Sequence, residues 1–178
     1  MQDLLNQEIN SDETIIWTGS PAQGLMLKAS DTLMIPFSLM WGGFAIFWEA
    51  SVFSSNAPIF FRLWGVPFVL VGLYIIIGRF FFDAKLREGT IYGLTNKRAI
   101  IISGLFSKKI TSINLKNIPE VQVTKKSNGS GTIILGSSNP LQFFQNSGWP
   151  GASKGAPSFE GIQNVDLVKN YIRQYQNT

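Results

Sequence analysis

Two long apolar runs, separated by only five residues, constrain this chain more than any other feature of its sequence. The first covers residues 33–53 with Glu49 as its single charge, and the second covers residues 59–82 with charges only at Arg62 and Arg79. A helix needs about 20 residues to cross roughly 30 Å of bilayer hydrocarbon. Neither run has the polar stripe that a helix at the surface of a water-soluble core usually shows. The sequence therefore predicts two membrane-spanning helices.

The link between the runs, residues 54–58, is too short for anything except an antiparallel hairpin, so both chain ends are expected on the same side. Basic residues near the ends of spanning helices set their orientation, with the positive side facing the cytoplasm. The tip of the hairpin offers Arg62 alone. The other side has six basic residues: Lys28, Arg79, Lys85, Arg87, Lys97 and Arg98. We therefore expect a multi-pass protein of the cytoplasmic (inner) membrane with both termini in the cytoplasm.

The few charges in and beside the spans need partners, because an isolated charge in hydrocarbon is costly. Folding the hairpin about its tip places Glu49 level with Arg62 near the outer surface, and Asp31 level with Arg79 near the inner one. We expect these two intramembrane pairs to be structural. A proton or ion pathway is the alternative, but it would need an ionisable group near mid-membrane, where the runs have none.

The composition excludes most catalytic chemistry. Cysteine and histidine are both absent, which removes disulfides, thiolate sites, the commonest metal ligand and the usual general base at neutral pH. The acidic residues of the C-terminal half fall on separate predicted elements, so they form no acid–base pair. We expect a protein that is not an enzyme, with no catalytic residues, no cofactor and no metal.

After residue 82 the chain changes to short segments rich in β-branched and aromatic residues, separated by turn sequences. Strands are predicted over residues 91–95, 99–103, 109–115, 121–125, 132–135 and 158–162, and residues 13–19 form a further short strand or an extended arm. A helix follows at 164–176, with an apolar stripe at helical spacing: Val165, Val168, Tyr171, Ile172 and Tyr175. The pattern predicts a curved or closed antiparallel sheet with this helix packed against it.

Three domains follow: an N-terminal cytoplasmic arm (1–32), the membrane α-hairpin (33–82) and a cytoplasmic domain (83–178) with a long loop at 136–157. The loop contains Phe143, Phe144 and Trp149. Exposed aromatic side chains mark contacts with a partner or with the bilayer interface. The alternative is that the loop folds back as a lid over an open end of the sheet.

Several short motifs in a fixed order resemble the bacterial pleckstrin-homology (PH)-like domain of small membrane proteins. They are YGLTNKR at 92–98, GLF at 104–106, INL at 113–115 with IPEV at 118–121, GSGTI at 129–133, and the Trp-x-Gly-x-Pro segment at 17–21. The resemblance implies an all-β-type PH-like split barrel of about seven strands, capped by a C-terminal helix and preceded by a two-helix hairpin. It implies no established activity. The chain departs from the pattern at 136–157, where the family usually has a short connection.

Charge is distributed unevenly, with a net −4 over residues 1–32 and +7 over residues 83–178. Candidate contacts with lipid headgroups or a partner are the three aromatic residues of the loop and six basic residues: Lys85, Arg87, Lys97, Arg98, Lys108 and Lys109.

Two functions remain open. The first is a membrane protein that presents its PH-like module to an unidentified protein partner, or to a second copy of itself, for membrane-complex assembly. The second is an anionic-lipid-binding sensor or envelope-stress factor. A third interpretation is that the basic residues lie in ordinary solvated turns and reflect only the enrichment of basic residues on the cytoplasmic side of a membrane. Nucleic acid is not expected, since no reading motif accompanies the charge.

Overall fold

The computed structural model describes residues 2–28, 31–105, 107–137 and 155–176. Among these residues, one compact unit contains 2–24, 84–137 and 155–176, and the other contains 25–28 and 31–83. The second unit is the predicted hairpin. The first unit, which we call the PH-like unit, is built from chain on both sides of it.

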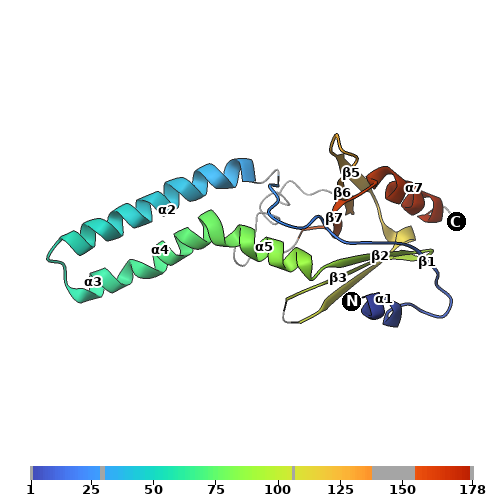
Figure 1. Ribbon diagram of the computed structural model, residues 1–178, viewed down its shortest axis with the longest axis horizontal. Coiled ribbons are helices and arrows are strands. Elements are labelled where there is room, and N and C mark those ends of the chain that lie inside the picture. Colours follow the sequence, from blue (N-terminus) through green and yellow to red (C-terminus); the bar gives the residue numbers. More distant parts are fainter. Residues whose placement is uncertain (1, 29–30, 106, 138–154, 177–178) are drawn as a thin grey trace. The chain divides into compact units, whose positions relative to one another are not determined.

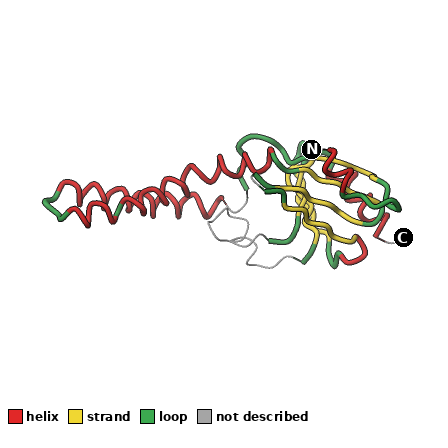
Figure 2. The backbone as a smooth tube through the Cα atoms, turned by 90° about the horizontal axis from the view of Figure 1, so that it is seen from below, coloured by secondary structure: helices red, strands yellow, loops and turns green. Residues whose placement is uncertain are grey.

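The hairpin consists of α2 (Asp31–Ser54) and a second helical arm that runs from Ile59 to Glu88 (Figures 1 and 2). This arm contains α3 (Ile59–Trp64), α4 (Val66–Leu73), a π-helical turn η1 (Tyr74–Gly78) and α5 (Arg79–Glu88). Both arms are long and apolar enough to cross a membrane. The arm continues six residues beyond the predicted end at 82. Those residues form helix readily and include an i,i+3 ion pair between Lys85 and Glu88, whereas the predicted boundary followed apolarity alone.

The two arms pack through a narrow seam. The buried residues of α2 recur every three or four positions: Asp31, Met34, Ser38, Gly42, Ala45 and Glu49. Glycines meet across the seam, since a Cβ added at Gly72 would lie 3.1 Å from the Cα of Gly42. Small residues of this kind let two helices approach closely. Most of the large apolar side chains of both arms point away from the seam and are exposed.

The PH-like unit contains two antiparallel sheets (Figure 1). The first has the order β1 (Ile15–Gly19), β2 (Ile91–Thr95), β3 (Arg98–Ser103) and β4 (Lys109–Asn114). The second has the order β5 (Val121–Lys125), β6 (Gly131–Leu135) and β7 (Ser158–Ile162). A 3₁₀ turn, η2 (Leu115–Asn117), lies between them in sequence, and α7 (Val165–Gln176) follows β7. The two sheets and the C-terminal helix agree with the predicted PH-like fold.

The residues before the hairpin, where an N-terminal arm with a short strand was expected at 1–32, contribute to this fold as far as Gly24. Strand β1 pairs with β2, with Thr18 opposite Gly93, and a short helix α1 (Gln2–Gln7) precedes it. Trp17 on β1 packs against Phe159 on β7, with ring centroids 5.6 Å apart. The hairpin is thus inserted between two adjacent strands. Sequence patterns near residue 15 carry no information about a partner strand more than 70 residues away.

The main core lies between the sheets and α7. Val165, Val168 and Ile172 are fully buried there, and Tyr171 and Tyr175 pack against the same cluster. The predicted apolar stripe of the C-terminal helix is therefore confirmed.

Candidate functional site

Arg87, one of the expected surface contacts, is instead an internal anchor. It is only 4% exposed. Its guanidinium donates hydrogen bonds to the carbonyl oxygens of Ala22 and Gly24 at 2.6 and 2.7 Å. These carbonyls belong to the segment that follows β1, so Arg87 holds that segment against the end of α5. Arg87 was expected to face lipid or a partner, whereas the contacts seen here are made within the chain.

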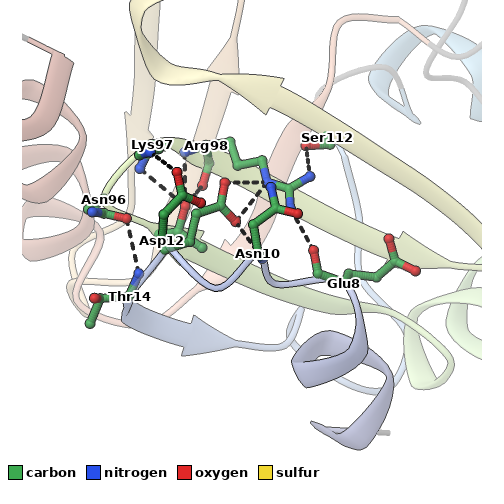
Figure 3. Close-up of polar contacts among 10 residues, drawn as sticks. Glu8, Asn10, Asp12, Thr14, Asn96, Lys97, Arg98 and Ser112 are labelled. Atoms are coloured by element: carbon green, nitrogen blue, oxygen red, sulfur yellow. Dashed lines mark hydrogen bonds and ion pairs between the residues drawn. The ribbon is translucent and has the colours of Figure 1, made fainter.

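Lys97 and Arg98, at the turn between β2 and β3, contact acidic residues of the N-terminal segment, and the side chain of Lys97 stays 48% exposed (Figure 3). Lys97 forms an ion pair with Asp12. Arg98 donates from Nε to the carboxylate of Glu13 at 2.8 Å, from Nη2 to the carbonyl of Glu8 at 2.5 Å, and from Nη1 to the hydroxyl of Ser112 at 3.1 Å. The side chain of Glu13 is only 3% exposed. Both basic residues thus face this acidic segment, which differs from the free basic turn that was expected.

The same turn is fixed by backbone contacts. The amide of Asn96 donates to the carbonyl of Thr14 at 3.1 Å, and the amide of Thr14 donates to the side chain of Asn96 at 3.0 Å. The ammonium of Lys97 lowers the pKa of the Asp12 carboxyl, mainly through their hydrogen bond and also through its charge. Residues 8–14 therefore bind the β2–β3 turn by both charge and backbone pairing.

The remaining basic candidates lie at the surface. Lys85 is exposed and pairs with Glu88 at 2.8 Å. Lys108 is exposed beside the turn between β3 and β4 and donates to the carbonyl of Gly104 at 3.3 Å. Lys109 is exposed at the start of β4. Phe143, Phe144 and Trp149 lie outside the described residues.

The hairpin contains one of the two expected ion pairs. Nη1 of Arg79 lies 2.7 Å from Oδ1 of Asp31, and both side chains are buried. Lys28 and Asp83 form a second, half-buried pair in this unit at 3.1 Å.

The pairing of Glu49 with Arg62 is absent, so this expectation is wrong. Arg62 donates to the carbonyl of Ser55 at the tip, at 2.9 Å. Glu49 is buried against Gly65, and neither of its carboxylate oxygens has a hydrogen-bond partner among the residues that the structure describes. The expectation was based on the equal depth of the two residues in the hairpin. Equal depth does not determine which hydrogen-bond partner each side chain reaches.

The described residues contain no group of three or more Asp, Glu, His or Cys side chains that could hold a metal ion. What they do contain is a sheet surface on which a segment of the same chain is bound. Sequence reasoning missed that contact, although one signal pointed to it. The net charge of −4 before the hairpin and +7 after it are complementary.

Comparison with known proteins adds one match. The model of the bacterial PH domain family matches residues 44–154, which is more than half of the chain. No curated protein and no solved structure matches. The matched range begins within α2 and covers the second hairpin arm and strands β2 to β6. The chain therefore belongs to the bacterial PH domain family.

Proposed function

We propose that this protein is anchored in the cytoplasmic membrane by its hairpin and presents its PH-like unit in the cytoplasm as a protein-interaction module. The observation that carries the membrane part is the arrangement of side chains in the hairpin. Its seam is lined mostly by small and polar residues, together with Met34 and Ile75, and its outer surface by large apolar ones. In water this order would be reversed, because burial of large apolar side chains drives folding. In lipid it is the expected one.

The distribution of basic residues supports a cytoplasmic location for both termini. The tip carries Arg62 alone, whereas the open end of the hairpin has Lys28, Arg79, Lys85 and Arg87 within and next to its arms. Adding a cysteine at either terminus of this cysteine-free chain gives a direct test. Membrane-impermeant maleimide should label neither thiol in intact cells and both after lysis. A thiol introduced by Asn56→Cys at the tip should react in intact cells. Labelling of a terminal thiol in intact cells would contradict the topology.

A protein partner is favoured over lipid by the way the basic residues are used. Three of the six basic candidates, Arg87, Lys97 and Arg98, are committed to contacts within the PH-like unit. Lys85, Lys108 and Lys109 lie at the surface, where Lys85 pairs with Glu88 and Lys108 donates to the carbonyl of Gly104, and none of them has the planar fork that binds phosphate in two places. Such charges attract an anionic membrane surface weakly and do not distinguish one lipid headgroup from another.

Cross-linking in membranes tests the partner. The tagged full chain is cross-linked in cells, purified and analysed by mass spectrometry beside an Ile172→Asp variant. A charge in the fully buried Ile172 position disrupts the PH-like core and leaves the hairpin sequence intact. Proteins enriched with the native chain and lost with the variant are the expected result. An identical set from both would place the interaction in the hairpin and contradict the proposal.

The lipid alternative has its own measurement. The full chain is placed in nanodiscs of neutral or anionic lipid, and hydrogen exchange is followed near Lys85, Lys108 and Lys109. Protection that appears only with anionic lipid, and disappears when the three residues are replaced by Gln, would favour the lipid sensor.

A further inference from the structure

The first sheet has an outer face with an apolar centre and a basic edge. On β3, Arg98, Ile100 and Ile102 alternate on this face, while Ala99 and Ile101 contribute to the main core. Residues opposite them on the neighbouring strands complete the surface: Gly93, Ile110 and Ser112. Ile100 and Ile102 are fully buried, and Ile110 is 42% exposed. The apolar strip thus extends beyond the part that is covered.

The cover is the N-terminal segment, residues 2–14. Leu5 of α1 is 1% exposed and forms a separate small core with Ile100 and Ile102, against which Leu4 and Ile9 pack. Gly93 makes this contact possible, because a Cβ at that position would lie 2.6 Å from Cδ1 of Leu5. Polar contacts hold the end of the segment at the β2–β3 turn, where Arg98 pairs with Glu13 and Lys97 pairs with Asp12 (Figure 3).

The bound segment defines the chemistry that the surface recognises. The segment is a short helix, α1, with the adjacent aliphatic residues Leu4 and Leu5. The acidic residues Asp12 and Glu13 follow this helix in the chain. Aliphatic side chains fill the centre of the face, and carboxylates neutralise its basic edge. This is the helix-on-surface mode of peptide recognition, with charge setting the direction of the peptide.

The segment is held apart from the main core. The Leu5 cluster shares no buried residue with the cluster between the sheets and α7. A six-residue helix is too short to be stable alone in water, so α1 depends on its contacts with this face of the sheet. Release of the segment would therefore uncover the Leu5 cluster and leave the contacts of the main core in place.

We propose that the outer face of β2–β4 is a docking surface for a partner protein's short helix of this kind, and that residues 2–14 are its intramolecular competitor. The proposal rests on the proposed function as a protein-interaction module. A tether of this length gives the competitor a high effective concentration, so a partner must displace it.

The first test measures release, and the absence of native cysteine makes it direct. A thiol is introduced by Ile102→Cys under the segment and, in a second chain, by Val168→Cys in the main core. Each is combined with Gly93→Ala or Leu5→Asp, which act from opposite sides of the contact. Maleimide labelling of the full chain should become at least tenfold faster at position 102 and remain unchanged at position 168. If neither variant speeds labelling at 102, or if labelling at 168 rises in parallel, the segment is a structural part of the fold and the proposal is wrong.

The second test measures docking with a defined probe, a fluorescent peptide of residues 1–14. The full chain carrying Leu5→Asp keeps the surface intact and should bind this peptide saturably. The native chain should bind it at least tenfold more weakly, because its own segment is in place. A peptide with Asp12→Asn and Glu13→Gln should lose at least tenfold in affinity. No binding to a chain that the thiol assay shows to be open would overturn the proposal.

One further outcome would reassign the surface. Dimerisation of the native chain that Leu5→Asp abolishes would make a second copy the occupant, and the partner-protein proposal would fall. Failure of the peptide assay leaves the cross-linking result untouched, so this inference and the proposed function fail separately.

Discussion

Asp31 and Arg79 form a buried ion pair at the end of the hairpin away from its tip, with Oδ1 and Nη1 2.7 Å apart. Asp31 also accepts a hydrogen bond at 2.6 Å from the amide of Lys28, which fixes the start of α2. The pair therefore fastens both arms of the hairpin at one level. Removing one partner leaves the other charge buried without its counterion, which is costly in a dry environment.

Breaking this pair should destabilise the hairpin strongly. We expect Asp31→Asn and Arg79→Gln each to lower the stability of the hairpin, and the double variant to lose less than the sum of the two single losses. The measurement is the unfolding free energy of the full chain in detergent for both single variants and the double variant. Lys28→Gln, which removes the half-buried partner of Asp83, is the control and should cost at most about 1 kcal/mol. Strictly additive losses at Asp31 and Arg79 would contradict the coupling.

Glu49 should behave in the opposite way. Its buried carboxylate has no hydrogen-bond partner among the described residues, and an unpartnered charge at such a site is unfavourable. We expect Glu49→Gln to leave the hairpin as stable as before or to stabilise it. Combined with Arg62→Gln the effects should simply add, since Arg62 binds the carbonyl of Ser55. A coupling free energy well above 1 kcal/mol between the two residues would show that they pair after all.

The C-terminal helix offers a matched pair of aliphatic truncations. Ile172 is fully buried and Leu167 is 43% exposed on the same helix. We expect Ile172→Ala to cost about 2–5 kcal/mol in the stability of the PH-like unit, because it leaves a cavity in the core. Leu167→Ala should cost far less. Hydrogen exchange of the β5–β7 amides in the full chain measures this unit without interference from the hairpin. Equal effects of the two truncations would mean that the helix face is misassigned.

Attachment of the N-terminal segment should depend on pH. Since Lys97 lowers the pKa of Asp12 in the folded protein, the deprotonated form is favoured by folding. The contribution of Asp12 is therefore fully present above its ordinary pKa of about 4 and is lost as the pH falls through the lowered value. Thiol labelling at Ile102→Cys should accelerate below pH 4, once corrected for thiolate reactivity against a free thiol.

The matched variant for this prediction is Asp12→Asn, which removes the titrating group. It should label faster at pH 7 and show a flatter dependence on acid. An unchanged acid profile in this variant would contradict the assignment of the effect to Asp12.

Local sequence patterns were sufficient to predict several elements of this fold. Hydropathy placed the two hairpin arms, alternation and turn residues placed strands such as 91–95 and 121–125, and a 3.6-residue period placed the buried face of α7. These patterns work because each reflects the environment of one element, whichever element it packs against.

Which elements contact one another was visible only in the folded chain. Glu13 and Arg98 are 85 residues apart, and the whole hairpin lies between them. Strand β1 joins the sheet across the same gap, Leu5 covers the outer face of β3, and Arg62 donates to Ser55 and not to Glu49. None of these contacts follows from a local period. Each contact depends on how the strands are paired and on which hydrogen-bond donors and acceptors lie within reach. Both are set only when distant parts of the chain come together.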